Sequence, residues 1–205
     1  MKKIILTVAA VFALTFANAQ DKKESSEGFA KGDLYLSGTA SYSSVTRGDL
    51  KENVLILSPG VGYFLSKNLA LEGQLGVISG KNYQDVYGNG AFYQVKTSGF
   101  GISAGVRYFW TPVNKFSLSL GGNISYVSLK EDADTSIGVT TSKIIGVNVP
   151  LGLHYFVSNS FAITTEWGGL SYSTDDNGGN GANKTDSLSL GLDLSSVSFG
   201  LIYKL

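Results

Sequence analysis

Apolar and polar residues alternate along most of this chain, from the region of Leu34 to its last residue, Leu205. A period of two puts successive side chains on opposite faces of an extended strand, so the alternating stretches are predicted strands. Beyond residue 32, no stretch follows the 3.6-residue period of an amphipathic helix convincingly. Eight strands are predicted, at residues 34–42, 55–65, 69–77, 100–108, 116–126, 145–155, 161–167 and 188–205.

Three positions interrupt the alternation. In the last strand the apolar phase shifts, which predicts a bulge near Ser195 and Ser196. Pro59 and Pro150 fall inside predicted strands, where each lacks the amide hydrogen that a sheet ladder uses. We expect local bulges at both prolines.

A Tyr-Phe pair precedes a short, Asn-containing turn three times, in GYFLSKNLAL, RYFWTPVNKFSL and HYFVSNSFAI. Tyr63, Tyr108 and Tyr155 are spaced by 45 and 47 residues, and Tyr203 follows 48 residues later. The chain is therefore predicted to contain four strand pairs joined by three tight turns. The opposite connections are longer and polar, at residues 43–52, 80–91, 130–141 and 174–186. This pattern predicts an all-β antiparallel meander with short turns at one end and four long loops at the other.

The polar face of the strands decides between two kinds of eight-stranded barrel. A soluble lipocalin-like barrel keeps its apolar face inside, whereas a transmembrane barrel turns it toward lipid. A water-facing outer surface would carry many Lys, Glu and Arg residues, but here this face is mostly Ser, Gly, Thr, Ala and Asn. Small side chains suit the narrow lumen of eight strands. We predict an eight-stranded antiparallel up-and-down transmembrane β-barrel.

Aromatic residues support this choice because they fall in two groups. One group lies near the short turns and the other toward the long loops, as in the aromatic belts of membrane barrels. The first contains Tyr63, Tyr108, Trp110, Tyr155 and Tyr203, and the second Tyr42, Tyr93, Tyr126 and Trp167.

The N-terminal residues predict export. Lys2 and Lys3 precede a short apolar run, and Ala17 and Ala19 form a small-residue cleavage site. We expect a cleaved signal peptide at residues 1–19, a flexible periplasmic tail at 20–32 and the barrel at 33–205. Without the two lysines the chain has 14 basic and 16 acidic residues and no basic stripe for nucleic acid. It has no Cys, which excludes disulfides and thiol chemistry.

Few charged residues fall on the predicted inner face. Arg107, Glu72 and Glu166 lie in the half of the lumen near the short turns, with Gln74 and His154 beside them, and Lys143 is a further candidate. An Arg between two carboxylates would form a buried ion-pair network that plugs the barrel. This is the candidate functional cluster.

Other chemical signals are weaker. His154 is the single histidine, and a catalytic triad would need Ser and carboxylate partners, but a lone lumen histidine is more often a hydrogen-bonded filler. The tripeptide RGD at Arg47 lies in the first long loop and could mimic an adhesion ligand, although a chance occurrence is strongly favoured for so short a motif. Asp175, Asp176 and Asn177 offer oxygen ligands for weak calcium binding, or simply form a solvated loop. We assign no cofactor.

The last residues, SFGLIYKL, resemble the C-terminal signal that outer-membrane barrels present to the barrel-assembly machinery. The resemblance rests on Ser198, Gly200, Tyr203 and Leu205, and Leu205 stands where this signal more often has Phe. The phrases SPGVGYFLSKNLALE and ANAQ resemble small outer-membrane barrels of Bacteroidetes-type bacteria, related in architecture to the OmpA and OmpX barrels. This implies an outer-membrane location.

The function expected from these features is a non-enzymatic structural or adhesion-like role through four extracellular loops. A small-solute pore, a lipid-modifying barrel enzyme and a soluble lipocalin-like binder remain alternatives. The expected partners are outer-membrane lipid, the assembly machinery and an unknown surface ligand, with the protein itself a monomer.

Overall fold

The computed structural model describes residues 28–85, 90–133, 138–179, 181–191 and 198–205. The predicted signal peptide and most of the predicted tail lie outside these residues. The strands are β1 (Leu34–Arg47), β2 (Leu50–Phe64), β3 (Leu69–Gln84), β4 (Tyr93–Phe109), β5 (Phe116–Ala133), β6 (Val139–Phe156), β7 (Phe161–Asp175), β8 (Thr185–Leu190) and β9 (Ser198–Lys204). Among the described residues, no helix is long and apolar enough to cross a membrane.

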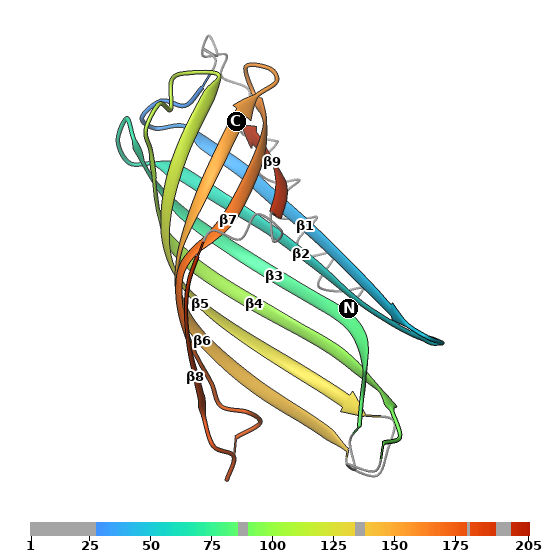
Figure 1. The fold of residues 1–205 in the computed structure, drawn as a ribbon. Coiled ribbons are helices and arrows are strands. Elements are labelled where there is room, and N and C mark those ends of the chain that lie inside the picture. Colours follow the sequence, from blue (N-terminus) through green and yellow to red (C-terminus); the bar gives the residue numbers. More distant parts are fainter. Residues whose placement is uncertain (1–27, 86–89, 134–137, 180, 192–197) are drawn as a thin grey trace.

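The strands close into one antiparallel barrel (Figure 1). From β1 to β7, each strand pairs with the next along the chain. Both β8 and β9 pair with β7, so they are two segments of the eighth barrel strand. The seam is closed by β1 and β9, from Tyr35 opposite Lys204 to Ala40 opposite Phe199. The predicted fold class is therefore confirmed, with the last strand beside the first.

The apolar face of the strands lies on the outside of the barrel. Leu75, Ile102 and Ile124 are 48%, 52% and 64% exposed, although they lie in the middle parts of their strands. Facing inward on β5, in contrast, Ser117 and Ser119 are buried. A soluble lipocalin-like barrel has the reverse arrangement, so the structure excludes that alternative.

The three short turns explain the repeated Tyr-Phe pairs. Leu65 donates its amide to Leu69 O at 2.9 Å, and the Ser66 hydroxyl accepts from the Leu69 amide at 3.2 Å. The third turn repeats this pattern, with the Ser158 hydroxyl accepting from the Phe161 amide at 3.1 Å. Because the side chains alternate, each Tyr of a pair points out and each Phe points into the barrel. Tyr63, Tyr108, Tyr155 and Tyr203 are exposed outside, whereas Phe64, Phe109 and Phe156 are buried.

The two prolines inside strands behave differently. At Pro150 the pairing of β6 with β7 shifts register between Val149 and Leu151, so the predicted bulge is present. Gly169 belongs to the opposing strand there, and a Cβ on it would lie 2.3 Å from Val149 O. At Pro59 the register with β3 is the same on both sides, so the predicted bulge is wrong. Pro59 is paired with Gly38 of β1, and only the ladder on its other side, toward β3, is interrupted.

The bulge predicted near Ser195 and Ser196 lies outside the described residues. The pairings on either side do differ: Leu190 pairs with Leu170, and Ser198 pairs with Glu166. Between these two pairs the chain advances by eight residues while β7 advances by four. The bulge itself stays a prediction.

The first distal hairpin contains more strand than the sequence predicts. The first long connection, at residues 43–52, is instead continuous sheet up to Arg47 and Leu50, with only Gly48 and Asp49 between them. Gly48 has φ +59°, as a tight two-residue hairpin turn requires. The prediction of a long first loop is wrong. Both faces of this hairpin meet water, so polar residues continue the ladder without the apolar alternation that marks a strand in the sequence.

The core of the protein lies at the short-turn end of the barrel. It contains Phe29, Tyr35, Phe64, Ala70, Phe109, Phe156, Ala162 and Ile202. Phe29 belongs to the predicted flexible tail, yet it is only 1% exposed. Gly28 and Phe29 of that tail are thus packed into the barrel mouth, while residues 30–32 are exposed, because burying a phenyl ring is more favourable than leaving it in water.

Candidate functional site in the lumen

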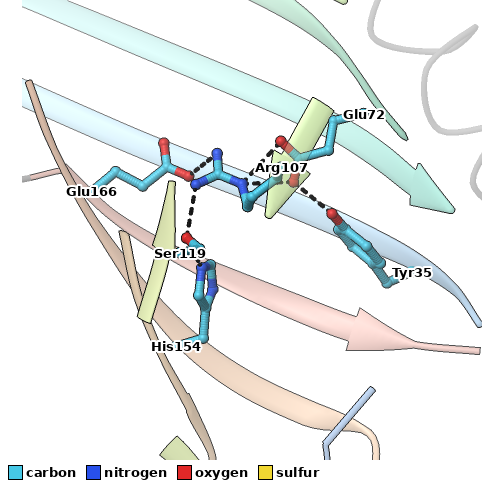
Figure 2. A network of polar contacts seen from close by, with 6 residues as sticks. All are labelled: Tyr35, Glu72, Arg107, Ser119, His154 and Glu166. Atoms are coloured by element: carbon cyan, nitrogen blue, oxygen red, sulfur yellow. Dashed lines mark hydrogen bonds and ion pairs between the residues drawn. The ribbon is translucent and has the colours of Figure 1, made fainter. Parts of the chain in front are cut away.

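Arg107 of β4 lies at the centre of a polar network inside the barrel (Figure 2). Its Nε is 2.9 Å from Glu72 Oε1 on β3, and its Nη2 is 2.6 Å from Glu166 Oε1 on β7. The Arg107 side chain is 6% exposed. Since β4 and β7 are not neighbours in the sheet, this second ion pair connects different parts of the barrel wall across the lumen.

The network extends to residues that the sequence did not single out. Tyr35 OH donates to Glu72 Oε1 at 2.5 Å, and Arg107 Nη1 donates to Ser119 Oγ at 3.2 Å. Ser119 Oγ is in turn 2.7 Å from His154 Nε2. Tyr35 had one sequence signal: it is a large side chain on a face of small residues, and its cross-strand neighbour is Gly62.

Glycines make room for these large side chains. A Cβ on Gly62 would lie 2.1 Å from Tyr35 Cζ, so the Tyr35 ring lies directly over this glycine. A Cβ on Gly152 would lie 2.6 Å from Ser119 Oγ. The abundance of glycine on the inner face therefore reflects close packing around the network.

Two adjoining cavities lie beside the network. The smaller has about 50 Å³ and is lined in part by Glu72, Arg107 and Glu166. The larger has about 240 Å³, and both are lined by Gln74 and Asn123. Gln74 therefore belongs to the cavity wall, between the network and the wider part of the lumen.

Lys143 does not join the predicted cluster. It is exposed and alternates in phase with Ile145, whose side chain is 58% exposed on the outer face. Its assignment to the lumen is wrong, because the apolar alternation of β6 weakens just where Lys143 stands. Glu72, Arg107, His154 and Glu166 do come together.

The environment of His154 is that of a packed, hydrogen-bonded side chain and not that of a catalytic triad. It is 2% exposed, and its Nδ1 has no hydrogen-bond partner among the described residues. Ser119 is fully buried and already contacts Arg107. A nucleophile needs access to substrate and a base oriented by a third group, and this Ser-His pair has neither.

The residues of the C-terminal signal occupy the seam strand β9. Gly200 fits tightly, since a Cβ on it would lie 2.7 Å from Thr39 Cγ2 and 2.8 Å from Gly38 O. Tyr203 points outward, and the Leu205 amide donates to Leu34 O at 2.9 Å. The other signal residue, Ser198, pairs with Glu166 of β7.

The acidic residues at the end of β7 accept hydrogen bonds from the backbone. Asp175 Oδ1 accepts from the Asn177 amide at 2.8 Å, and Asp176 Oδ1 accepts from the Lys143 amide at 2.7 Å. The Lys143 amide hydrogen bond, with one from Gly178, holds the pKa of Asp176 below its ordinary value. In the described part of the chain, no group of three or more His, Cys, Asp or Glu residues is placed to hold a metal.

An apolar exterior, a polar interior and a closed eight-stranded meander together define a transmembrane β-barrel. A family model of the outer membrane protein beta-barrel domain matches residues 6–199, and the chain belongs to this family. No curated protein matches the chain.

Solved structures of outer-membrane proteins share the fold. OprG from Pseudomonas aeruginosa is 15% identical with a TM-score of 0.53, over 88% of this chain and 99% of that one. Ail, the attachment invasion locus protein of Yersinia pestis, solved with the heparin analogue sucrose octasulfate, is 14% identical with a TM-score of 0.50, over 85% and 99%. A major outer membrane protein from Thermus thermophilus is 11% identical with a TM-score of 0.51, over 85% and 99%.

Proposed function

We propose that this outer-membrane barrel is a closed, non-enzymatic anchor for hairpins that bind a partner outside the cell. The supporting observation is strand length: β4, β5 and β6 have 17, 18 and 18 residues. About 9–11 residues suffice to cross the outer membrane. The surplus of about seven residues adds roughly 20 Å of strand at 3.4 Å per residue. On β5 this surplus is polar, with Lys130, Glu131 and Asp132 near its end.

By the bounds of the described strands, the hairpin of β1 and β2 has the shortest connection of these projections. Its tip exposes Arg47, Gly48 and Asp49 on a two-residue turn. A tight turn limits the conformations of the tip, which lowers the entropic cost of binding. This hairpin is our first candidate contact.

The charges of the hairpins favour a partner of mixed charge over a polyanion. Among the described residues of the hairpin ends, seven are basic and eight acidic. They are Arg47, Lys51, Lys81, Lys96, Lys130, Lys143 and Lys184, and Asp49, Glu52, Asp85, Glu131, Asp132, Asp175, Asp176 and Asp186. Binding of a heparin-like chain would need clustered excess positive charge.

A small-solute pore is the second candidate function. The cavity of about 240 Å³ favours it, because this part of the lumen has room for water. The ion pairs of Arg107 with Glu72 and Glu166 oppose it, because they cross the lumen near the short turns. We therefore favour the closed anchor.

Swapping hairpin ends tests the surface role. In a strain lacking the gene, each projecting hairpin is replaced by a strand pair cut at the apolar band and closed with Asn-Gly, a strong hairpin turn. We expect binding of intact cells to a panel of immobilised surface proteins and glycans to fall for at least one variant. Asp49→Glu keeps the charge and the hairpin but alters the RGD tripeptide. A loss of binding in this variant would assign the contact to the tip sequence, and unchanged binding would assign it to the hairpin as a whole.

Outer-membrane fractionation and heat-modifiable gel mobility are the controls for correct assembly. If the gene deletion and all hairpin swaps leave cell binding unchanged, the surface role is wrong. If the deletion instead lowers the uptake of small solutes, the pore becomes the better interpretation.

A further inference from the structure

The residue after each repeated tyrosine points into the opening of the barrel at its short-turn end, which we call the inner mouth. In the three turns this residue is Phe64, Phe109 or Phe156, and all three are at most 1% exposed. At the fourth equivalent position, after Tyr203, the chain has Lys204. Three rings and one ammonium group therefore face the same space.

Phe29 of the N-terminal segment occupies this space. Its ring stacks on Phe64 with the centroids 4.6 Å apart and meets the Phe156 ring edge-on at 4.8 Å. The Phe109 and Tyr35 rings lie 5.3 Å and 5.2 Å away. These four residues form a cage around one aromatic side chain.

Polar contacts fix the backbone around Phe29. The Phe29 amide donates to Pro112 O at 2.6 Å, and Lys204 Nζ donates to Gly28 O at 2.6 Å. Gly28 has φ +84°, and a Cβ there would lie 2.3 Å from Pro112 O, so this approach requires glycine. At the fourth repeat, Lys204 thus supplies a hydrogen-bond donor to the segment, whereas the other three repeats supply a phenyl ring.

The segment is separable from the barrel wall. It precedes β1, which begins at Leu34, so removing it leaves the strand pairs intact. One buried ring and a few hydrogen bonds offset the entropy lost by about six ordered residues. Such a balance is shifted easily by one substitution.

We propose that residues 28–33 form a plug that docks by Phe29 into this aromatic cage and seals the inner mouth of the barrel. The plug is a second closure, next to the ion pairs of Arg107. Two residues lie between them: the Tyr35 ring contacts Phe29 while its hydroxyl donates to Glu72, and the Phe109 ring lies 4.9 Å from that of His154. The proposal does not depend on the surface role of the hairpins, because it concerns the opposite end of the barrel.

Thiol accessibility tests the plug, since the natural chain has no cysteine. Ser117→Cys places a reporter on the inner face, where the serine is 1% exposed and next to His154 in the sheet. The rate of its reaction with a small charged methanethiosulfonate reagent is measured in purified, folded protein. We expect slow reaction with Phe29 present and a rise of roughly 10–100-fold in Phe29→Ala, within the range that loss of a buried ring allows.

Three further variants make the result specific. Phe100→Ala removes a ring that is 56% exposed on the outer face, and it should leave the reporter rate unchanged. Lys204→Met keeps the side-chain stem but removes the donor to Gly28 O, so it should raise the rate less than Phe29→Ala. Ser58→Cys, which lines the larger cavity, should react at the same rate with and without Phe29.

Heat-modifiable mobility checks that each variant is folded. An unchanged Ser117→Cys rate in folded Phe29→Ala would overturn the proposal, because the cage residues would then close the mouth alone. A rise at both reporters would also overturn it, because the barrel as a whole would have loosened.

Discussion

Arg107 is held in the lumen by partners on three other strands. Glu72, Glu166 and Ser119 surround its guanidinium, which leaves little of the side chain exposed to water. A planar guanidinium can donate to several acceptors at once, which a lysine ammonium matches poorly. The network is therefore specific for arginine.

Removing the cation should be costly. Arg107→Met leaves the Glu72 and Glu166 carboxylates without their counterion, and we expect a loss of about 3–5 kcal/mol in the free energy of unfolding. Urea titration of the refolded barrel measures it. Lys143→Met, which removes an exposed cation, should stay within about 0.5 kcal/mol.

Restoring charge balance should recover stability. The triple variant Glu72→Gln, Arg107→Met, Glu166→Gln has no uncompensated charge and should be more stable than Arg107→Met alone. Equal stabilities of Arg107→Met and Lys143→Met would show that the ion pairs do not hold the barrel together.

Gly62 allows a second test at the same scale. In Gly62→Ala the new methyl group meets the Tyr35 ring, which must move away from Glu72, and overpacking of this kind costs about 1–3 kcal/mol. Gly73→Ala, on the outer face with no atom within 4 Å of its Cβ, is the matched control and should be neutral or slightly stabilising. Urea titration compares the two, and equal midpoints would contradict the role of Gly62.

At the scale of strands, the sequence predicted the membrane-spanning parts well and the projecting parts poorly. A strand in lipid must have one apolar face, so apolar residues such as Leu71 and Ile102 recur at every second position and the strands are easy to predict. Above the membrane both faces of a hairpin meet water, and the pattern fades although the ladder continues. This is why Arg47 and Leu50 pair where a loop was predicted, and why Lys143 was placed on the wrong face.

The seam strand β9 supplies the prediction at this scale. Truncation of residues 203–205 removes the pairing of Tyr203 with Leu36 and the hydrogen bond from Leu205 to Leu34. We expect the truncated protein to be absent from the outer-membrane fraction. Normal insertion would show that closure of the barrel does not need its last residues.

For the whole molecule, the two closures predict how the lumen behaves. The Arg107 network and the Phe29 plug lie one behind the other, so the native protein should show no stable large conductance in planar bilayers. Either Arg107→Met or Phe29→Ala alone leaves one closure in place, and only the combined variant should raise conductance. A stable large conductance of the native protein would contradict both the plugged lumen and the proposed anchor role.

The candidate site was predictable only in part. Alternation and strand order place Glu72, Arg107 and Glu166 on one face near one end, and opposite charges then draw them together. Nothing in the alternation marks Phe29, because it lies in a short, mostly polar segment before the first strand. Its role follows from the cage, which forms only when the start of β1 and the three short turns come together in the folded barrel.

The contacts of Gly28 and Leu34 with the last two residues have a consequence for how the protein is made. Lys204 contacts Gly28, and Leu205 bonds to Leu34, so a short linker could join Leu205 to Gly28 and the chain could be reopened between Gly48 and Asp49. Such a circular permutant keeps every strand neighbour but no longer ends in β9. Refolding from urea into lipid, compared with insertion in living cells, would then separate what the folded barrel requires from what the cell's assembly machinery must read.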